Sequence, residues 1–314
     1  MTSVVDLFME YMSSVPLNWY ILFVVAILVP GTIIFLLFSI NTILAIYFEQ
    51  KVSAFMQDRL GPMEVGIFGF KGGKKFWGGI GQMIADAVKL LAKEDILPKD
   101  ADTKLMILAP FIIFISAFLT FMAVPLSSVF VISDFNIGLF YIVAMSSVVV
   151  IGIILAGWAS NNKWSLYGAM RSAAQIISYE IPIGLSLLLP VLAVGSLHIG
   201  DIVDWQSDNR WFIFHSPFAF IAFFIYFISG VAETNRAPFD IPEAESELVA
   251  GWMTEYSGFR WSLFFLSEYA NMLIISIVAA VVFLGGWLSP FTMFNLLPEE
   301  WLIFDGPIWG FFWL

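Results

Sequence analysis

The stretch Trp211–Glu247, WFIFHSPFAFIAFFIYFISGVAETNRAPFDIPEAESE, consists of a long apolar run followed by a segment rich in acidic residues. Residues 211–232 contain no Lys, Arg, Asp or Glu and are long enough to cross the hydrocarbon core of a bilayer as a helix. The next fifteen residues hold five acids and one arginine. Carboxylates at a membrane boundary are costly unless they are paired, hydrated or protonated. The stretch therefore predicts a spanning helix followed by a segment for proton or ion chemistry, for partner docking, or for both.

The composition of the whole chain extends this prediction to a multi-span, all-α integral membrane protein. Of its 314 residues, 60% are hydrophobic and 12% are charged, which is too little polar cover for a water-soluble domain of this size. The absence of cysteine excludes thiolate-held iron–sulfur clusters, and two histidines, His198 and His215, leave little for a haem or a multi-histidine metal site. We therefore predict no metal site, and we expect any electron carriers on other chains.

Uncharged runs predict a single membrane domain, 1–314, with six helical spans and the start of a seventh near Trp301. Thirteen of the fourteen Lys and Arg residues fall in loops on one side of this arrangement, so these loops are predicted to face the cytoplasm or its equivalent. The spans are predicted near residues 20–48, 105–131, 136–160, 172–197, 212–232 and 261–288, and the inner loops at 49–104, 161–171 and 233–260.

The first inner loop contains the pattern of an amphipathic helix near residues 80–93. Apolar residues recur at i, i+3 and i+4 spacing on one face, and polar residues mark the other face. Such a helix is expected to lie in the membrane interface or under a partner. The apolar face comprises Ile80, Met83, Ile84, Ala87, Val88 and Leu91; the polar face comprises Gln82, Asp86, Lys89 and Lys93.

Glu180 lies inside the fourth predicted span, two residues before Pro182. The proline removes a backbone hydrogen bond and loosens the helix around the acid. One interpretation is a membrane-embedded proton carrier, because ionisable groups within spans mark proton and ion pathways. The alternative is a near-interface acid paired with Arg171 or Lys163.

Three glutamates at every second position, Glu243, Glu245 and Glu247, form the densest acidic cluster. In an irregular loop that lines a cavity all three could converge, and such a group would hold protons near neutral pH. The alternative is a solvated acidic loop. Four further acids in the same inner segment favour the first interpretation: Glu233, Asp240, Glu255 and Glu268.

The segment Glu49–Pro62, EQKVSAFMQDRLGP, marks the exit of the first span. Its charged and apolar groups could frame an entrance for an amphiphile with a polar head, or they could form an interfacial anchor. Asp86, on the polar face of the amphipathic helix, is expected to form a solvated i, i+3 pair with Lys89. No nucleotide-binding loop, nucleophile triad or nucleic-acid patch is present.

Together these motifs resemble the quinone-channel subunit of respiratory complex I, the proton-translocating NADH:quinone oxidoreductase. This family comprises the H-type subunit of the bacterial complex and subunit 1 of the mitochondrial one. The resemblance runs from about residue 20 to 290. The motifs that carry it are Glu49–Pro62, Trp158–Arg171 followed by Gln175–Glu180, Glu233–Glu247, and Glu255–Tyr256 followed by Glu268–Asn271.

The resemblance implies a membrane subunit through which quinone, either ubiquinone or menaquinone, enters from the lipid and whose buried carboxylates couple quinone reduction to proton translocation. FMN and iron–sulfur clusters are then expected on partner subunits. The implied partners are the peripheral-arm subunits that carry the terminal iron–sulfur cluster and the headgroup ligands, the small membrane subunits and the antiporter-like subunits. The bacterial inner membrane is favoured over the mitochondrial one.

Site residues follow from the resemblance by position. Proton-coupling roles fall on Glu180, Glu233, Asp240, Glu243, Glu245, Glu247, Glu255 and Glu268. Roles at the quinone channel fall on Glu49 and Arg59 at the entrance, Asp86 and Glu94 near the cavity, and Arg171 and Arg236 as basic partners.

This sequence departs from the family pattern at Gln50, where an arginine is usual, in the stretch 66–77, which is longer than in many members, and at its end, where a further helix is expected. The homologous membrane subunit of an energy-converting hydrogenase is the closest alternative. A scaffold whose acids only bind the peripheral arm is another. A stand-alone ion transporter is disfavoured because no internal repeat is visible.

Overall fold

The computed structural model describes residues 19–63, 65, 78–128, 131–242 and 245–289, and in these ranges every regular element is a helix. Side chains are described from Leu28 onward, except those of Glu245 and Ser246. The helices are α2 (Trp19–Met56), α4 (Ile80–Ala92), α5 (Thr103–Met122), α6 (Gly138–Ser146), α7 (Val148–Ala159), α8 (Lys163–Val194), α9 (Ile199–Asp208), α10 (Pro217–Glu233), α11 (Glu245–Leu248) and α12 (Gly258–Phe283), with 3₁₀ turns η2 (Phe212–Phe214) and η3 (Gly251–Met253).

Five of the described segments are long and apolar enough to cross a membrane: 28–56, 103–122, 138–159, 163–194 and 258–283. Helix α10 is apolar but shorter, with 17 residues. The all-helical class is thereby confirmed for the described residues, whereas the count of six spans stays a prediction. The expected start of a seventh span near Trp301 lies outside the described residues.

Several helices begin or end elsewhere than the predicted spans; α5, for example, ends at Met122 rather than near residue 131. Helix α2 continues to Met56 rather than ending near residue 48, so Glu49 lies on a helix. Helix α8 begins at Lys163 rather than at 172, because the Asn162 side chain caps it by accepting a hydrogen bond from the Trp164 amide at 3.0 Å. Charge marks where a chain leaves the apolar core, and a helix can continue past that point.

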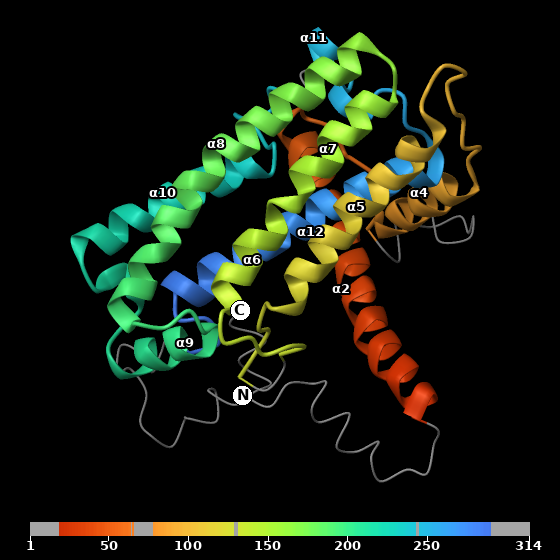
Figure 1. Cartoon of the computed structure of the whole chain (residues 1–314). Helices are drawn as coiled ribbons and strands as arrows, with labels where there is room; N and C mark the ends of the chain where they lie inside the picture. Colours follow the sequence, from red (N-terminus) through yellow and green to blue (C-terminus); the bar gives the residue numbers. More distant parts are fainter. Residues whose placement is uncertain (1–18, 64, 66–77, 129–130, 243–244, 290–314) are drawn as a thin grey trace.

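Small residues let the helices approach closely. Helix α7 lies between α5 and α8, and α12 packs on α5 (Figure 1). A Cβ added to Gly157 would lie 2.3 Å from the Ala169 Cβ, so only glycine permits this approach of α7 to α8. At Gly168 the close neighbour is backbone, because an added Cβ would lie 2.7 Å from the Gly251 Cα.

The predicted amphipathic helix near 80–93 is present as α4, which packs against α12 and α2. Met83 is buried, but Val88 and Leu91 of the apolar face are 54% and 63% exposed. Gly79 precedes the helix with φ +99°, and a Cβ there would lie 1.9 Å from the Pro62 carbonyl oxygen. The position of α4 in a membrane interface stays a prediction.

Helix α9 was not expected from the sequence. Its buried residues include Ile202, Val203 and Gln206. The Gln206 side chain donates to the Val281 carbonyl oxygen at 2.9 Å and accepts from the amides of Phe212 and Gly285, each at 3.0 Å. One buried amide therefore joins α9 to the end of α12.

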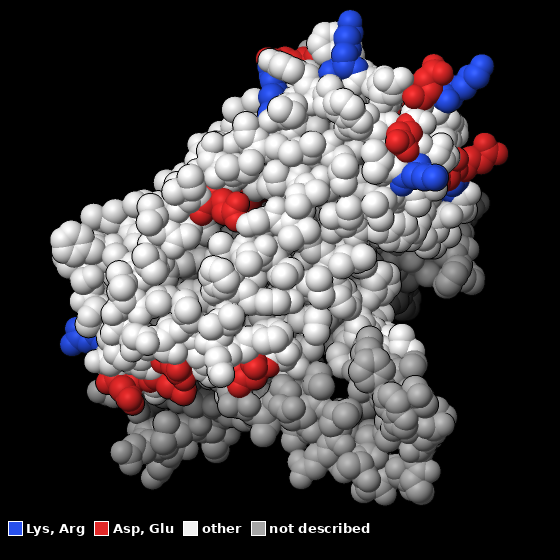
Figure 2. All heavy atoms as spheres, viewed as in Figure 1, with Lys and Arg blue, Asp and Glu red and all other residues white. Residues whose placement is uncertain are grey.

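Charged residues gather at the two ends of the molecule, with a mostly uncharged band between them (Figure 2). Basic residues gather at the end that carries α11 and α4, whereas the end that carries α9 shows mainly acids (Figures 1 and 2). This distribution agrees with the predicted sides of the membrane: the end that carries α11 and α4 is the inner end, and the end that carries α9 is the outer end.

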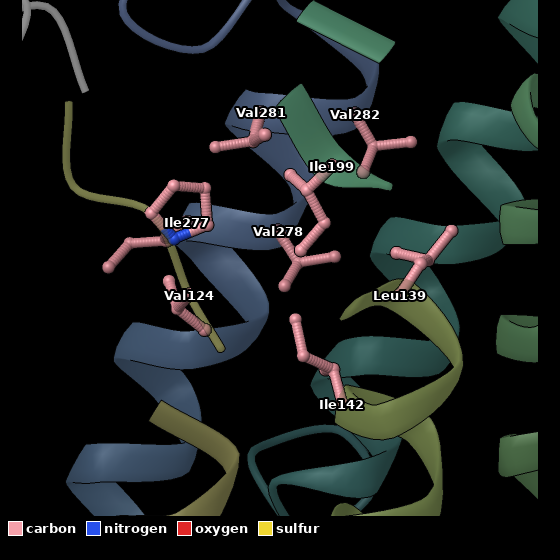
Figure 3. Close-up of a pocket in the computed structure, with 9 residues that line it drawn as sticks. Val124, Leu139, Ile142, Ile199, Ile277, Val278, Val281 and Val282 are labelled. Carbon is pink, nitrogen blue, oxygen red and sulfur yellow. The ribbon is translucent and has the colours of Figure 1, made fainter. Parts of the chain in front are cut away.

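A narrow apolar gap with no room for a water molecule lies near α9, between α6 and α12. Its aliphatic side chains, including Leu139, Ile142, Ile199 and Val278, point toward one another (Figure 3). A cavity with a purely apolar lining stays dry and offers no group for chemistry. It is a packing gap and not a candidate site.

Candidate functional site

The densest ionic contact in the described part of the chain surrounds Arg236, three residues beyond the end of α10. Its Nη1 donates to Glu49 Oε1 at 3.0 Å, and its Nη2 lies 3.0 Å from Glu268 Oε1. Glu49 comes from α2 and Glu268 from α12. One guanidinium therefore ties three distant parts of the sequence together at the inner end.

Tyr269 completes this cluster. Its hydroxyl donates to Glu49 Oε2 at 2.6 Å, and the Arg236 guanidinium lies over its ring, 4.7 Å from the centroid. Burial by itself would lower the pKa of Arg236, but the carboxylates of Glu268 and Glu49 and the Tyr269 ring raise it above its ordinary value. The cation therefore persists at every physiological pH. Within the described residues its Nε has no hydrogen-bond partner.

A small cavity of about 40 Å³ lies beside the Arg236 cluster. Two of the predicted acids, Glu233 and Glu268, line it. A cavity of this size with convergent polar groups can hold water, unlike the apolar gap near α9. The rest of the lining mixes polar and apolar side chains: Thr234, Asn235, Asn271, Trp252, Met253, Phe264, Ile113, Val149, Ile153 and Ile176.

Gln175 on α8 fixes the loop that carries the cluster. Its Nε2 lies 2.8 Å from the carbonyl oxygens of Ala232 and Phe239 and 3.2 Å from Asn235 Oδ1. Asn235 adopts φ +51°, a left-handed conformation that asparagine tolerates better than most residues. The positions of Glu233 and Arg236 therefore depend on one side chain of a neighbouring helix.

Glu180 is half-buried on α8, and its Oε1 accepts a hydrogen bond from the Ser147 hydroxyl. The two proposed basic partners contact other groups. Arg171 donates to Glu247 at 2.7 Å, and the Lys163 ammonium lies over the Trp164 ring at 5.2 Å. The structure therefore does not pair Glu180 with either of them. The charge of Glu180 acts on Glu233, which places the two carboxylates in one electrostatic system.

The other predicted residues lie apart from Arg236. Glu255 accepts from Asn162 at 2.6 Å, and Asp86 pairs with Lys89 at 2.9 Å on the surface of α4, as the i, i+3 interpretation expects. Arg59, Glu94, Asp240 and Glu247 are exposed. Glu243 lies outside the described residues, and Glu245 lies on α11 with its side chain outside the description, so convergence of the three glutamates stays a prediction.

Sequence reasoning missed the ion pair between Arg260 and Asp95 at the inner end. Arg260, at the start of α12, is only 7% exposed, and its Nε and Nη2 both bind Asp95 Oδ2, the former at 2.7 Å. The Ser257 hydroxyl accepts from the Ile96 amide at 3.1 Å beside it. These contacts attach the segment after α4 to α12. An arginine next to an apolar run was the available signal.

The outer end carries a histidine between two carboxylates. His198 caps α9, with its Nε2 2.7 Å from Asp134 Oδ1 and its Nδ1 2.9 Å from Asp201 Oδ1. Burial lowers the pKa of His198, but the hydrogen bonds with Asp134 and Asp201 outweigh this effect and raise it overall. The Ser196 hydroxyl donates to Asp201 at 2.5 Å and is the largest cause of a lowered pKa of that carboxyl.

Among the described residues, no three His, Asp or Glu side chains converge as metal ligands would. The chemistry that the inner arrangement supports is the exchange of protons and charge between carboxylates around a fixed cation.

The chain is similar to known proteins of one family. A family model described as NADH dehydrogenase matches residues 29–314. The chain is 46% identical over 309 residues to the H-type subunit of the NADH-quinone oxidoreductase of Chlorobaculum parvum, covering 97% of this chain and 82% of the relative. It is 50% identical over 273 residues to the same subunit of Chlorobium luteolum, covering 86% and 70%. It is 50% identical over 279 residues to that of Bacteroides thetaiotaomicron, covering 88% and 74%.

Proposed function

This chain belongs to the H-type subunit family of NADH-quinone oxidoreductase, a membrane component of complex I, and from this membership we propose that its inner end receives quinone and that its buried acids couple quinone reduction to proton translocation. The observation that carries the proposal is Arg236 bridging Glu49 and Glu268 beside a cavity that Glu233 also lines. The other residues assigned from the family pattern act around this centre.

The surface of α2 supports the quinone part of the proposal. Leu36, Ile40, Leu44 and Phe48 are 53%, 56%, 42% and 61% exposed along the helix that ends in the Glu49 segment. An apolar surface that leads to a charged cluster suits an amphiphile with a long apolar tail and a polar head. Quinone is the substrate of this class, and we assign its entrance to Glu49 and Arg59.

Charge balance supports the proton part. Reduction of quinone to quinol consumes two electrons and two protons, so negative charge develops near the inner end until protons arrive. Arg236 cannot release its proton, and it can respond only by shifting between its carboxylate partners. Glu268 and Glu233 share the cavity, and the charge of Glu180 acts on Glu233. Protons would therefore pass from the cavity toward the middle of the α8 span.

The same reasoning assigns partner surfaces. The peripheral-arm subunits with the iron–sulfur clusters and the quinone headgroup ligands would bind the inner end, where Arg171, Glu247 and Glu255 lie. The small membrane and antiporter-like subunits would bind the membrane face near Glu180, since a half-exposed carboxylate within a span requires a protein partner or water. FMN would be held by the peripheral arm, and the bacterial inner membrane is the proposed location.

The test replaces Glu268 or Glu180 by glutamine in the assembled complex. Each change removes a protonatable group with little change of shape, and we expect a drop of roughly tenfold or more in NADH:quinone reductase activity and proton pumping. Reduction of an artificial acceptor by the peripheral arm should stay normal. Asp208→Asn, which removes an exposed acid at the outer end, is the matched control. Normal rates and normal pumping in both glutamine variants would overturn the proposal.

A further inference from the structure

The third predicted span is interrupted beside Glu180. Helix α6 ends at Ser146 and α7 begins at Val148, so Ser147 lies at the junction between them. Its dihedral angles stay helical, φ −59° and ψ −26°, and the junction is a local change of backbone hydrogen bonding in which the Val150 amide donates to the Ser147 carbonyl oxygen at 3.3 Å. The junction is supported from α5, where the Ser116 hydroxyl donates to the Met145 carbonyl oxygen at 2.5 Å. No proline or glycine occupies positions 138 to 151 apart from Gly138 at the start of α6, so side-chain hydrogen bonds are the remaining local cause of the interruption.

The Ser147 hydroxyl faces two acceptors. Its Oγ lies 3.0 Å from the carbonyl oxygen of Val143, one turn earlier on the same span, and it also bonds Glu180 Oε1 on α8. A serine hydroxyl carries a single hydrogen, so it donates fully to one of these oxygens at a time. The choice decides whether α6 and α8 are joined or whether the hydrogen bond stays within the third span.

The charge of Glu180 decides between the two acceptors. An ionised carboxylate accepts only and forms stronger hydrogen bonds than a neutral carbonyl. A protonated carboxyl group has a hydrogen of its own to donate and loses this advantage. The Ser147 hydrogen then returns to the Val143 carbonyl, as serines in helices commonly do.

We infer that Ser147 is a positioning residue whose single hydrogen moves between Glu180 and Val143 as Glu180 loses and gains its proton. This inference rests on the proposed role of Glu180 as a proton carrier. It adds a structural response to that role. Each time Glu180 gains or loses its proton, the hydrogen bond between Glu180 and Ser147, which lies between α6 and α7, breaks or forms. The hydrogen bonding of the third span would thereby depend on the charge of Glu180 in the fourth span.

Ser146 supplies a matched control. Its hydroxyl donates to the same Val143 carbonyl oxygen at 2.9 Å, and within the described residues it makes no bond to Glu180. Ser146→Ala and Ser147→Ala therefore remove the same group from adjacent positions with the same backbone acceptor, and they differ in the contact with Glu180.

The experiment compares Ser147→Ala, Ser147→Thr and Ser146→Ala in the assembled complex. Loss of one hydrogen bond to a charged group predicts a roughly tenfold lower coupled rate for Ser147→Ala. Ser147→Thr keeps a hydroxyl and should retain most of the activity, and Ser146→Ala should match the parent complex. If Ser147→Ala does not assemble, Ser147→Cys, a weaker donor, should give an intermediate rate.

Infrared difference spectra separate a moving hydrogen bond from a static one. The bands of Glu180 are assigned by their loss in Glu180→Gln. In Ser147→Ala the carboxylate band should shift and the protonated carboxyl band should not. A shift of both bands, or of neither, would overturn the inference.

The two proposals fail in different ways. Normal pumping in Glu180→Gln would overturn the proton-carrier role and the Ser147 inference with it. A strong defect in Glu180→Gln combined with parental rates in Ser147→Ala and Ser147→Cys would overturn the Ser147 inference alone.

Discussion

Each end of the molecule holds one basic side chain between two carboxylates, but the two clusters differ in assembly and in chemistry. Arg236 at the inner end binds Glu49, 187 positions away, and Glu268 on α12. His198 at the outer end binds Asp201 three positions away and Asp134 64 positions away. A guanidinium keeps its charge at physiological pH, whereas an imidazole titrates. The inner cluster can therefore respond to a new charge only by exchanging partners, and the outer cluster can respond to pH by losing its charge.

Removal of the inner cation should give the largest effect. Arg236→Gln leaves Glu49 and Glu268, the latter with a side chain only 16% exposed, without their shared partner. We expect a loss of more than tenfold in NADH:quinone reductase activity per assembled complex, with normal electron transfer to an artificial acceptor. His198→Gln is the paired variant and should stay within about twofold of the parent, since a conservative change away from the site costs little. If both variants lose the same fraction of NADH:quinone reductase activity, the two clusters do not differ in function and the prediction is wrong.

Removal of the ion pair between Arg260 and Asp95 should affect stability instead of chemistry. Arg260→Met leaves Asp95 without the two guanidinium contacts that join the α4 segment to α12. Because Asp95 is 43% exposed and can be rehydrated, we expect a destabilisation of about 2–3 kcal/mol. Release of the subunit from the purified complex on heating measures this effect. The rate of NADH:quinone reduction per intact complex should be preserved. A lower rate with unchanged heat resistance would contradict this prediction and would give Arg260 a role in the chemistry, like that of Arg236.

Titration of the outer cluster should give the smallest effect. The pKa of His198 is raised in the folded protein, so its contribution to stability is fully present below the ordinary value of 6.5 and is lost as pH rises through the higher folded value. Amide hydrogen exchange of residues 196–201, corrected for intrinsic rates, should therefore speed up with rising pH in that window. His198→Gln should remove the dependence. A pH-independent parent would mean that the imidazole is not charged in this turn.

The sequence predicted the class of fold and the identity of the chemical groups much better than their partners. Hydrophobic runs and the i, i+3, i+4 pattern located the long apolar helices and α4, because burial in lipid or against a neighbour imposes those patterns directly. Glu233, Glu268, Glu49 and Arg236 were all assigned by the family pattern. The convergence of Glu49 and Glu268 on the Arg236 guanidinium was not, since it depends on how α2, α12 and the loop after α10 pack together.

The missed features have local causes that a charge count does not detect. The start of α8 depends on the Asn162 cap, and the bond between Ser147 and Glu180 depends on a junction within a span that reads as uninterrupted apolar sequence. Gln206 and Arg260 are single polar residues beside apolar segments, where solvent exposure and burial with a partner give the same sequence pattern. A pattern fixes which side chains are polar, and packing decides which of them meet.

The close approach of Gly168 to Gly251 has a genetic consequence. Every amino-acid replacement that one nucleotide change can make at a glycine codon adds at least a Cβ, which at Gly168 would lie 2.7 Å from the Gly251 backbone. A shift to relieve that overlap would move α8 away from the turn at 251–253. Gly251 has no side chain, so a second mutation there could not make room. Inherited variation at Gly168 should therefore be rare and without compensating partners, in contrast to the charged positions, where one acid can replace another.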